Sequence, residues 1–141
     1  MTSTEAPTTA DPPEPSGRAG PRAAFGRYGE DLAVRYLRER GMEVLERNWR
    51  CEHGEVDILA RDGGCLVICE VKTRRSSAFG EPVEAVTAAK AARLRRLAAA
   101  YLGSARARSA VRVDRVRVDV LGILCRPGEP AVVRHVEGVG S

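Results

Sequence analysis

Residues 54–74 of the chain read GEVDILARDGGCLVICEVKTR, with two apolar runs rich in β-branched residues on either side of Asp62-Gly63. An Asp-Gly pair between such runs favours a two-residue type I′ turn, so the stretch predicts a β-hairpin. With Asp62 and Gly63 as the loop, Leu59 lies opposite Leu66, because directly opposed residues of an antiparallel pair share a face. This register divides the side chains between an apolar face and a partly charged face.

The apolar face of the predicted hairpin should be pressed into the core of the protein. Its members are Val56, Ile58, Ala60, Cys65, Val67, Cys69 and Val71. At the far end of the opposite face, Asp57 and Glu70 become diagonal neighbours with Cβ atoms roughly 7 Å apart, near enough to reach one hard cation. Glu55 and Lys72 lie at the same end. Carboxylates crowded beside one amine repel one another, and a divalent ion, a proton or further cations would relieve the repulsion.

The order Asp57, then Glu70-Val71-Lys72, resembles the PD-(D/E)xK nuclease signature. In that signature an Asp and a Glu on adjacent strands hold Mg²⁺, and a Lys two residues further on attends the attacking water. The spacing alone is weakly specific, but the hairpin between the acids and the shared face of Asp57, Glu70 and Lys72 strengthen it. The alternative is an edge hairpin whose charged end is merely solvated.

Length and composition indicate one folded domain behind an N-terminal tail. At 141 residues the chain has room for one domain with a hydrophobic core. Residues 1–22 hold five of the eight prolines and no aromatic residue, which predicts a disordered Pro-rich tail ahead of a domain over residues 23–141. No stretch has the pattern of a signal peptide or the length of a membrane span, so we expect a cytoplasmic protein without membrane contacts.

Soft metal ligands are few and scattered. The four cysteines, Cys51, Cys65, Cys69 and Cys125, fit reduced thiols in a cytosolic protein better than a disulfide framework. Cys65 and Cys69 are separated by four residues of strand, roughly 13 Å, which is too far to chelate one zinc. His135 stands alone and is expected to be structural rather than a general base. We therefore do not expect a zinc site.

The charge of the chain favours a polyanionic partner. The net charge is +4, and the tail's two arginines against three acids give −1, so the folded part carries about +5. Of the 23 basic residues, only Lys72 and Lys90 are lysines. A retained Lys then suggests a place where Arg would not serve, because a compact ammonium fits beside a metal-bound water and a planar guanidinium does not. Chance retention of the two lysines is the alternative.

The first helix is predicted from about Ala24 to Arg40, with Gly41 as its stop. Apolar residues recur at helical spacing, namely Leu32, Ala33, Tyr36 and Leu37. Glu30 lies in the first turn of this predicted helix, at the border of the buried face. Glu30 is either a carboxylate favoured by the helix dipole or a third acid leaning over the charged end of the hairpin, and the sequence does not choose between them.

The remaining pattern predicts an α/β fold with the element order αβββαββ around a mixed sheet of about five strands. Besides the hairpin, strands are expected over 42–50, from near 115 to 123, and over 131–136. A second helix should run from Thr87, as its N-cap, to about Leu102, with Gly103 as the stop. Its inward side chains would be Leu94, Leu97, Ala98 and Tyr101.

Cations gather in the loop and the helix that follow the hairpin. The candidate contacts to nucleic acid are Arg74, Arg75, Lys90, Arg93, Arg95 and Arg96. Arg74 and Arg75 open a loop with Phe79, a surface suited to a phosphate backbone or an unstacked base. The alternative for this loop and for the helix is plain solvation. Lys90 lies in the first turn of the second predicted helix, where the helix dipole disfavours a cation. Its position therefore needs another explanation, which is either contact with the acidic cluster or contact with phosphate.

Short motifs along the domain resemble the YraN-type family of predicted endonucleases. They are Gly29-Glu30 with Ala33 and Tyr36-Leu37, Arg47-Asn48-Trp49-Arg50, Gly54-Glu55-Val56-Asp57, Glu70-Val71-Lys72-Thr73-Arg74, Phe79-Gly80, and Glu84-Ala85-Val86-Thr87 through Lys90. The likeness covers roughly residues 24 to 135, and so many motifs at workable spacings are hard to obtain by accident.

The resemblance implies a restriction-endonuclease-like α/β fold with a PD-(D/E)xK core, similar to archaeal Holliday junction resolvases. It also implies an active centre made of a helix Glu, a strand Asp and the Glu-x-Lys pair. Those roles fall on Glu30, Asp57, Glu70 and Lys72, with no departure in the acids or the Lys.

The leading hypothesis is a Mg²⁺- or Mn²⁺-dependent endonuclease acting on DNA. Asp57, Glu70 and the Val71 carbonyl would bind the ion, and Lys72 would position or deprotonate the attacking water. Glu30 would complete or support the metal shell, and Glu55 is a further candidate for a supporting role.

Two hypotheses from other classes compete with the endonuclease. A nucleic-acid-binding protein that keeps the nuclease fold without turnover would bind DNA in a salt-sensitive way, without a divalent ion and regardless of Lys72. A protein-interaction module would instead cover the basic helix with a partner. Duplex, single-stranded and branched DNA and RNA all stay open as substrates. Cutting of junctions would favour a two-fold homodimer, although the sequence has no stripe of exposed apolar residues that would predict a dimer interface.

Overall fold

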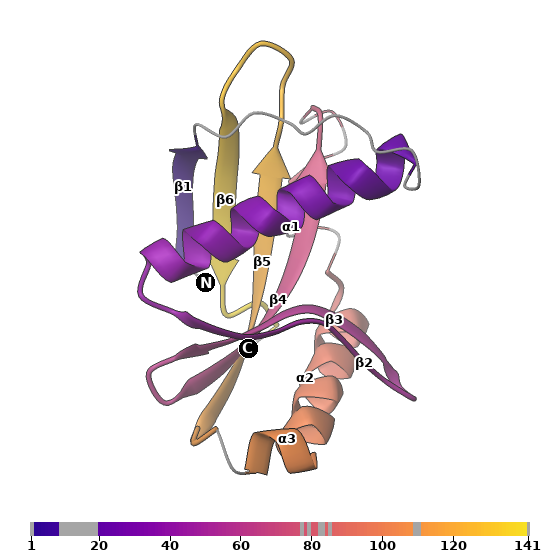
Figure 1. Cartoon of the computed structure of the whole chain (residues 1–141), viewed down its shortest axis with the longest axis vertical. Helices are drawn as coiled ribbons and strands as arrows, with labels where there is room; N and C mark the ends of the chain where they lie inside the picture. The colour runs from indigo at the N-terminus through magenta and orange to yellow at the C-terminus, as the bar shows by residue number, and fades with distance from the viewer. Residues whose placement is uncertain are drawn as a thin grey trace.

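The protein has an α/β fold, in which a mixed β-sheet is flanked by helices (Figure 1). In the computed structural model of the chain, the described residues are 2–8, 20–76, 78, 80–81, 84, 86–108 and 111–140. The elements are β1 (Thr2–Thr8), α1 (Pro21–Glu39), β2 (Glu43–Cys51), β3 (Gly54–Asp62), β4 (Cys65–Arg74), α2 (Ala88–Leu102), α3 (Ala105–Arg108), β5 (Arg115–Leu124) and β6 (Ala131–Glu137).

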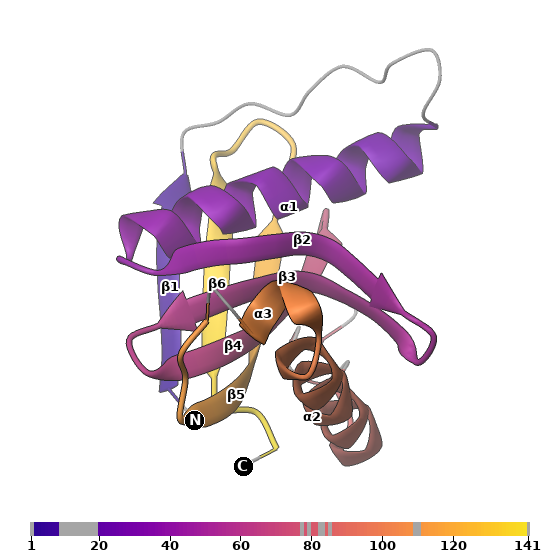
Figure 2. The ribbon, with the colours of Figure 1, turned by 60° about the horizontal axis from the view of Figure 1, so that its bottom comes forward.

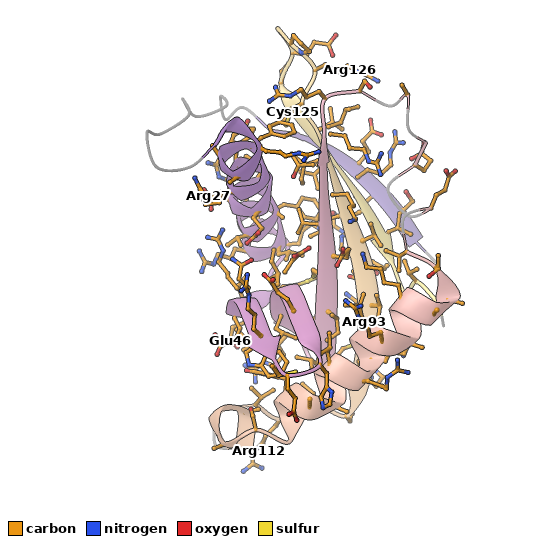
Figure 3. The ribbon with its side chains drawn as sticks, turned by 90° about the vertical axis from the view of Figure 1, so that its right-hand side faces the viewer. Arg27, Glu46, Arg93, Arg112, Cys125 and Arg126 are labelled. Carbon is orange, nitrogen blue, oxygen red and sulfur yellow. The ribbon has the colours of Figure 1, made fainter. Side chains whose placement is uncertain are left out.

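The six strands form one sheet in the order β1-β6-β5-β4-β3-β2. β4 and β5 are parallel, and the other neighbouring pairs are antiparallel. A parallel pair needs a crossover between its strands, and the segment containing α2 supplies it. Seen from the side in Figure 3, α1 lies on one face of the sheet and α2 on the other. Each face carries its own cluster of buried apolar side chains.

Both long helices were predicted, with one difference at the start of α1. Thr87 caps α2 as expected, since its Oγ1 accepts a hydrogen bond from the Lys90 backbone N–H at 3.1 Å. α1 begins at Pro21, earlier than predicted, because proline suits the first turn of a helix, where a backbone N–H has no helical partner. Glu30 therefore lies in the middle of α1, and the prediction that it occupies a first turn is wrong.

The hairpin of β3 and β4 was predicted, but its two-residue turn lies one residue further along the chain than expected. Asp62 pairs with Cys65, so the loop consists of Gly63 and Gly64. Gly63 adopts φ 58°, which glycine accepts without strain, and the Asp62 carboxylate is held in the strand by Arg117 at 3.3 Å.

The shift of register preserves the predicted faces of the hairpin in most positions. Leu59 lies opposite Ile68 rather than Leu66, two residues further along β4, and a shift of two leaves a side chain on the same face. The predicted apolar residues that pack under α1 are Ile58, Ala60, Cys65, Val67, Cys69 and, in part, Val71. Val56 is the exception and packs in the cluster on the α2 side, although Ile58, two residues further on, packs under α1.

Residues Thr2–Thr8 form edge strand β1, whereas the sequence placed them in a disordered tail. The strand pairs antiparallel with β6, where it satisfies backbone groups that would otherwise form an open edge. Ala6 packs against the core under α1, and Glu5 pairs with Arg134 at 2.5 Å. The middle of the predicted tail, residues 9–19, lies outside the described residues.

Among the described residues, no helix combines the length and the apolar character needed to cross a membrane.

Candidate functional site

Asp57 lies where the ladder between β3 and β4 ends. The last pair of that ladder is Ile58 with Cys69. Beyond it, the backbone N–H of Val71 donates a hydrogen bond to Asp57 Oδ2 at 2.9 Å. The carboxylate therefore takes the place of a strand partner and is fixed beside the C-terminal part of β4.

The surroundings of Asp57 disfavour a negative charge. Burial raises the pKa of Asp57 to about 6, against the lowering effect of the Val71 N–H. The negative charges of Glu70 and Glu30 add to the increase, and Lys72 reduces it. Glu70 of β4 and Glu30 of α1 thus both act electrostatically on Asp57 of β3.

Glu70 is buried and is held by the only two lysines of the chain. Lys90 Nζ donates a hydrogen bond to Glu70 Oε1 at 2.8 Å, and Lys72 Nζ lies 3.3 Å from the same oxygen. The sequence left two explanations for a cation in the first turn of α2. Of these two explanations, contact with the acidic cluster is the one that the structure supports, because Lys90 contacts Glu70.

Glu30 reaches the same region from the middle of α1 and is anchored by β2, which runs alongside α1 in Figure 2. Asn48 Nδ2 donates to Glu30 Oε1 at 3.0 Å, and Arg47 Nη2 lies 3.6 Å from that oxygen. Asn48 has φ 51°, a left-handed conformation that asparagine tolerates better than most residues. Contacts from β2, and not the helix dipole, therefore account for the position of Glu30.

Gly29 lets α1 approach the end of β4. A Cβ added at Gly29 would overlap the Thr73 side chain, with Thr73 Cβ and Cγ2 only 2.8 Å away. Real Cβ atoms do not come so close, so any larger residue would push the helix and the strand apart. The neighbouring Glu30 would move with the helix.

An open hollow of about 690 Å³ lies between the start of α1 and the end of β4. It is lined by Arg22, Phe25, Gly26, Glu30, Asp57, Val71, Lys72, Thr73 and Arg75. Glu30, Asp57, Val71 and Lys72 were all predicted site residues, and the structure brings them together here. Glu70 does not line the hollow, but it contacts Lys72 and acts electrostatically on Asp57.

Among the other predicted residues, Arg75 also lines this hollow, whereas Glu55, Arg74 and the arginines of α2 do not. Glu55 pairs with Arg50 at 3.1 Å near the turn between β2 and β3. Arg74 lines a separate, smaller hollow of about 80 Å³, which Lys72 also lines. Arg93 and Arg96 are exposed on α2 and Arg95 is partly buried there; Figure 3 labels Arg93. Phe79, the aromatic residue of the predicted contact loop, lies outside the described residues.

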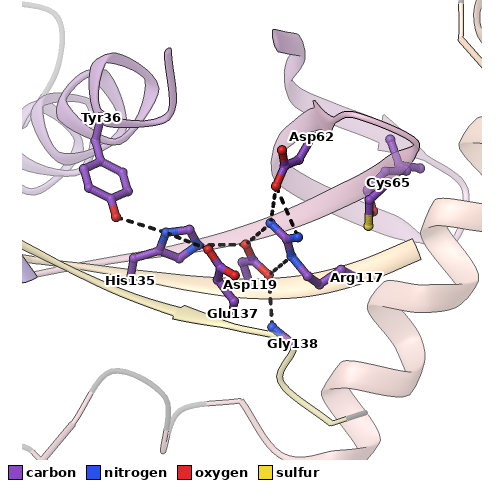
Figure 4. Close-up of polar contacts among 9 residues, drawn as sticks. Tyr36, Asp62, Cys65, Arg117, Asp119, His135, Glu137 and Gly138 are labelled. Carbon is purple, nitrogen blue, oxygen red and sulfur yellow. Dashed lines mark hydrogen bonds and ion pairs between the residues drawn. The ribbon is translucent and has the colours of Figure 1, made fainter. Parts of the chain in front are cut away.

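A second polar cluster, which the sequence analysis missed, lies under α1 on β5 and β6 (Figure 4). Asp119 and His135 are fully buried, with His135 Nε2 2.7 Å from Asp119 Oδ2. Arg117 Nε donates to Asp119 Oδ1 at 2.9 Å, and the hydroxyl of Tyr36 lies 3.1 Å from His135 Nδ1. The alternation of Arg117 and Asp119 with valines in RVRVDV was the signal that could have revealed two charges on one buried face.

The cluster includes a group that could hold a metal ion, formed by Asp119, His135 and Glu137 with ligand atoms within 4.8 Å of one another. Burial alone would raise the pKa of Asp119, but hydrogen bonds from His135 and Arg117 outweigh burial and lower it. Asp119 also accepts from the Gly138 N–H at 3.1 Å. The carboxylate is therefore already neutralised and hydrogen-bonded by the chain itself, which fits the prediction of a structural His135.

All four cysteines are free thiols, as predicted. Cys65, Cys69 and Cys125 are buried, and Cys51 is partly buried. Burial raises the pKa of the Cys69 and Cys125 thiols, so they are less reactive than exposed cysteines at neutral pH.

Comparison with known proteins places the chain among close relatives. A UPF0102 protein from Kineococcus radiotolerans is 55% identical over 116 residues, which cover 82% of this chain and 93% of that protein. One from Acidothermus cellulolyticus is 50% identical over 132 residues, covering 87% of this chain and 98% of its own. One from Streptomyces griseus is 55% identical over 119 residues, covering 84% and 97%.

The model of a family described as "Uncharacterised protein family UPF0102" matches residues 29–123. The matched segment includes Glu30, Asp57, Glu70 and Lys72 together with the hairpin that positions three of them. The chain therefore belongs to the UPF0102 family, which is the YraN-type family that its motifs resemble.

Proposed function

We propose that the protein hydrolyses phosphodiester bonds of DNA with a divalent metal ion, as an endonuclease with a restriction-endonuclease-like PD-(D/E)xK core. One observation supports the proposal most directly. The ladder of the β3–β4 hairpin ends next to Asp57, and the carboxylate is tied there to the strand that carries Glu70 and Lys72. Asp57 and Lys72 both line one open hollow, as a nuclease site requires of its metal ligand and its ammonium.

The donors at this place fit Mg²⁺ or Mn²⁺. Asp57, Glu70 and the Val71 carbonyl offer hard oxygen ligands, and sulfur and imidazole ligands are not part of the proposed set. Glu70 and Glu30 both act electrostatically on Asp57, and added positive charge favours the ionised form of Asp57. When bound, the ion would act as a Lewis acid on the phosphate and lower the pKa of a coordinated water.

The two lysines would then have different roles at the site, with Lys90 positioning Glu70 and Lys72 contacting the substrate or the attacking water. Lys90 holds Glu70 at 2.8 Å, so the more distant Lys72, at 3.3 Å, is freer to turn toward the hollow that it lines. In this role the Lys72 ammonium would hold the attacking water or a phosphate oxygen. The phosphate contact that the sequence suggested for Lys90 gives way to this positioning role.

The two remaining acids, Glu30 and Glu55, would support the site beside Asp57 and Glu70. Glu30 is held at the hollow by Asn48, so it can orient a water or complete the metal shell without reorganising. Glu55 pairs with Arg50 and would act only as a distant support.

DNA would reach the site along cationic side chains. The net charge of +4 and the cations Arg74, Arg75, Arg93, Arg95 and Arg96 favour a phosphate backbone. Arg75 lines the hollow itself, so it would contact nucleotides nearest the reacting phosphate.

The test is a panel of labelled linear, flapped and four-way DNAs incubated with Mn²⁺ and, separately, with a chelator. We expect wild-type protein to cleave at least one substrate only with the metal, and Asp57→Ala and Lys72→Ala to lose cleavage while keeping the wild-type circular dichroism spectrum. Glu52→Ala, which removes an exposed acid at the β2–β3 turn, is the matched control and should cleave normally. Cleavage that survives both site changes would contradict the proposed roles.

A second candidate is a DNA-binding protein without turnover. It is favoured by the ion pairs of Glu70, because two lysines already neutralise this carboxylate without any metal. It predicts salt-sensitive DNA binding that neither a chelator nor Lys72→Ala changes. The same panel, measured for binding as well as for cleavage, separates the two functions.

A further inference from the structure

The Arg75 guanidinium lies over the Phe25 ring, and both residues line the hollow that Asp57 also lines. Arg75 Cζ lies 4.1 Å from the centroid of the Phe25 ring, so the pair links the end of β4 to the first turns of α1. The ring is partly buried and packs on the core under α1, which fixes it in place. Arg75 is exposed, so its guanidinium keeps a surface open to a ligand.

The charges around the hollow distinguish its mouth from its floor. Arg22 and Arg75 are exposed and line the hollow together with Phe25, whereas Glu30 and Asp57 are partly buried acids. A phosphate approaching the acids needs a cation between them, but a group at the mouth meets positive charge and the guanidinium of Arg75, which lies over the Phe25 ring. The mouth therefore suits a planar group attached to a nearby anion.

A nucleobase has this chemistry. Bases stack on aromatic rings and on guanidinium planes, and such stacking tolerates any sequence because every base has a π-face. Inside a duplex, however, both faces of a base are covered by its neighbours. A base that stacks on the Phe25–Arg75 pair must therefore come from a nucleotide that is unpaired or splayed out of the helix.

We infer that Phe25 and Arg75, with Arg22 beside them, form a subsite for an unstacked nucleobase next to the phosphate that Asp57 and Lys72 address. The inference rests on the proposed function and names its substrate class: DNA with unpaired nucleotides at a flap, a gap or a branch. The volume of the hollow, about 690 Å³, leaves room for a nucleotide beside the site.

The test measures base binding and cleavage separately on two labelled DNAs, a fully paired duplex and the same duplex with a short single-stranded flap. A 2-aminopurine placed in the flap reports stacking by loss of its fluorescence, and this readout needs neither metal nor turnover. The proteins are wild type, Phe25→Leu, Phe25→Tyr and Arg75→Gln. Arg35→Gln, which removes an exposed arginine elsewhere on α1, controls for the loss of one charge.

We expect wild type to quench the 2-aminopurine and to prefer the flapped DNA. Phe25→Leu and Arg75→Gln should each weaken flap binding about tenfold, whereas duplex binding should match the Arg35→Gln control. Phe25→Tyr keeps a ring of similar shape and should retain binding, which separates stacking from loss of packing. Equal losses on flap and duplex, or quenching that survives both changes, would overturn the subsite.

Failure of the subsite and failure of the proposed function give different results. Cleavage of DNA without any quenching would leave the hydrolase standing and remove the subsite. Quenching that depends on Phe25 and Arg75, with no cleavage under any metal, would support the subsite on a protein that does not turn over.

Discussion

Lys90 Nζ lies closer to Glu70 Oε1, at 2.8 Å, than does Lys72 Nζ, at 3.3 Å. The nearer ammonium thus comes from α2 and not from the Glu-x-Lys motif itself. α2 is held against the sheet by its buried face, so Glu70 is tied to the packing of the helix as well as to its own strand.

Lys90→Met should lower the free energy of unfolding by about 1–3 kcal/mol, because the buried Glu70 loses its closest charged donor. Urea unfolding at pH 7 measures the change. Arg93→Met, an exposed arginine on the same helix, should stay within about 0.5 kcal/mol of wild type. In a Glu70→Gln background the cost of Lys90→Met should shrink, and an unchanged cost would contradict the pairing.

The pKa of Asp57 predicts how stability depends on pH. Burial raises it from an ordinary value near 4 to about 6, so between these values the folded state binds more protons than the unfolded state. Without metal, the free energy of unfolding should therefore fall as pH rises from about 4 to about 6, by up to about 3 kcal/mol from this residue. The loss should persist at neutral pH.

Asp57→Asn should remove this pH dependence and raise the melting temperature of the metal-free protein at pH 7, because the amide keeps an acceptor for the Val71 N–H without a charge. Thermal unfolding of both proteins over this pH range checks the prediction. Added Mn²⁺ should stabilise wild type more than the variant. If Asp57→Asn is less stable than wild type at pH 7 without metal, the charged carboxylate does not destabilise the fold.

Gly29→Ala should be destabilising and should reduce any activity, since the new Cβ overlaps the Thr73 side chain. Overpacking of this kind typically costs about 1–3 kcal/mol. Gly26→Ala is the matched control on the same helix, because nothing lies within 4 Å of the added Cβ, and it should be neutral or stabilising by up to about 1 kcal/mol. Thr73→Ala should partly rescue Gly29→Ala. Equal stability of the two alanine variants would argue against a close approach of α1 to β4.

Asp119→Ala should lower the free energy of unfolding by about 3–5 kcal/mol, because Arg117 would lose its buried partner. Tyr36→Phe removes only the hydroxyl that meets His135 and should cost about 1 kcal/mol. Chemical unfolding measures both changes. Because the hydrogen bonds from His135 and Arg117 outweigh burial and lower the pKa of Asp119, its contribution should be present above pH 4 and lost in more acidic solution. In Asp57→Ala, which lacks the proposed metal ligand of the hollow, a melting temperature that drops on addition of a chelator would instead indicate that a metal occupies the Asp119 cluster.

The sequence predicted the elements around the hairpin because their signals are local. The cap at Thr87, the stop at Gly103 and the alternation of valines in β5 each depend on neighbours in the chain. The register of the hairpin was wrong because Asp62-Gly63 and Gly63-Gly64 both suit a tight turn, and the contact that favours the second comes from Arg117, far along the chain.

Prediction of the site residues was likewise limited to contacts that local sequence signals encode. Asp57, Glu70 and Lys72 could be grouped because they belong to one hairpin. The anchoring of Glu30 by Asn48 depends on how α1 lies against β2, which no local pattern encodes. The Asp119–His135 pair joins two strands across the sheet, so each residue looked isolated in the sequence.

The placement of β1 has a consequence for the order in which the protein assembles. Glu5 and Arg134 meet although 129 positions separate them, and β1 pairs with the last strand of the chain. Contacts of such long sequence separation close large loops, so their formation is slow. During synthesis β1 must wait for its partner until β6 has left the ribosome, and the other five strands of the described sheet can come together before β1 joins them.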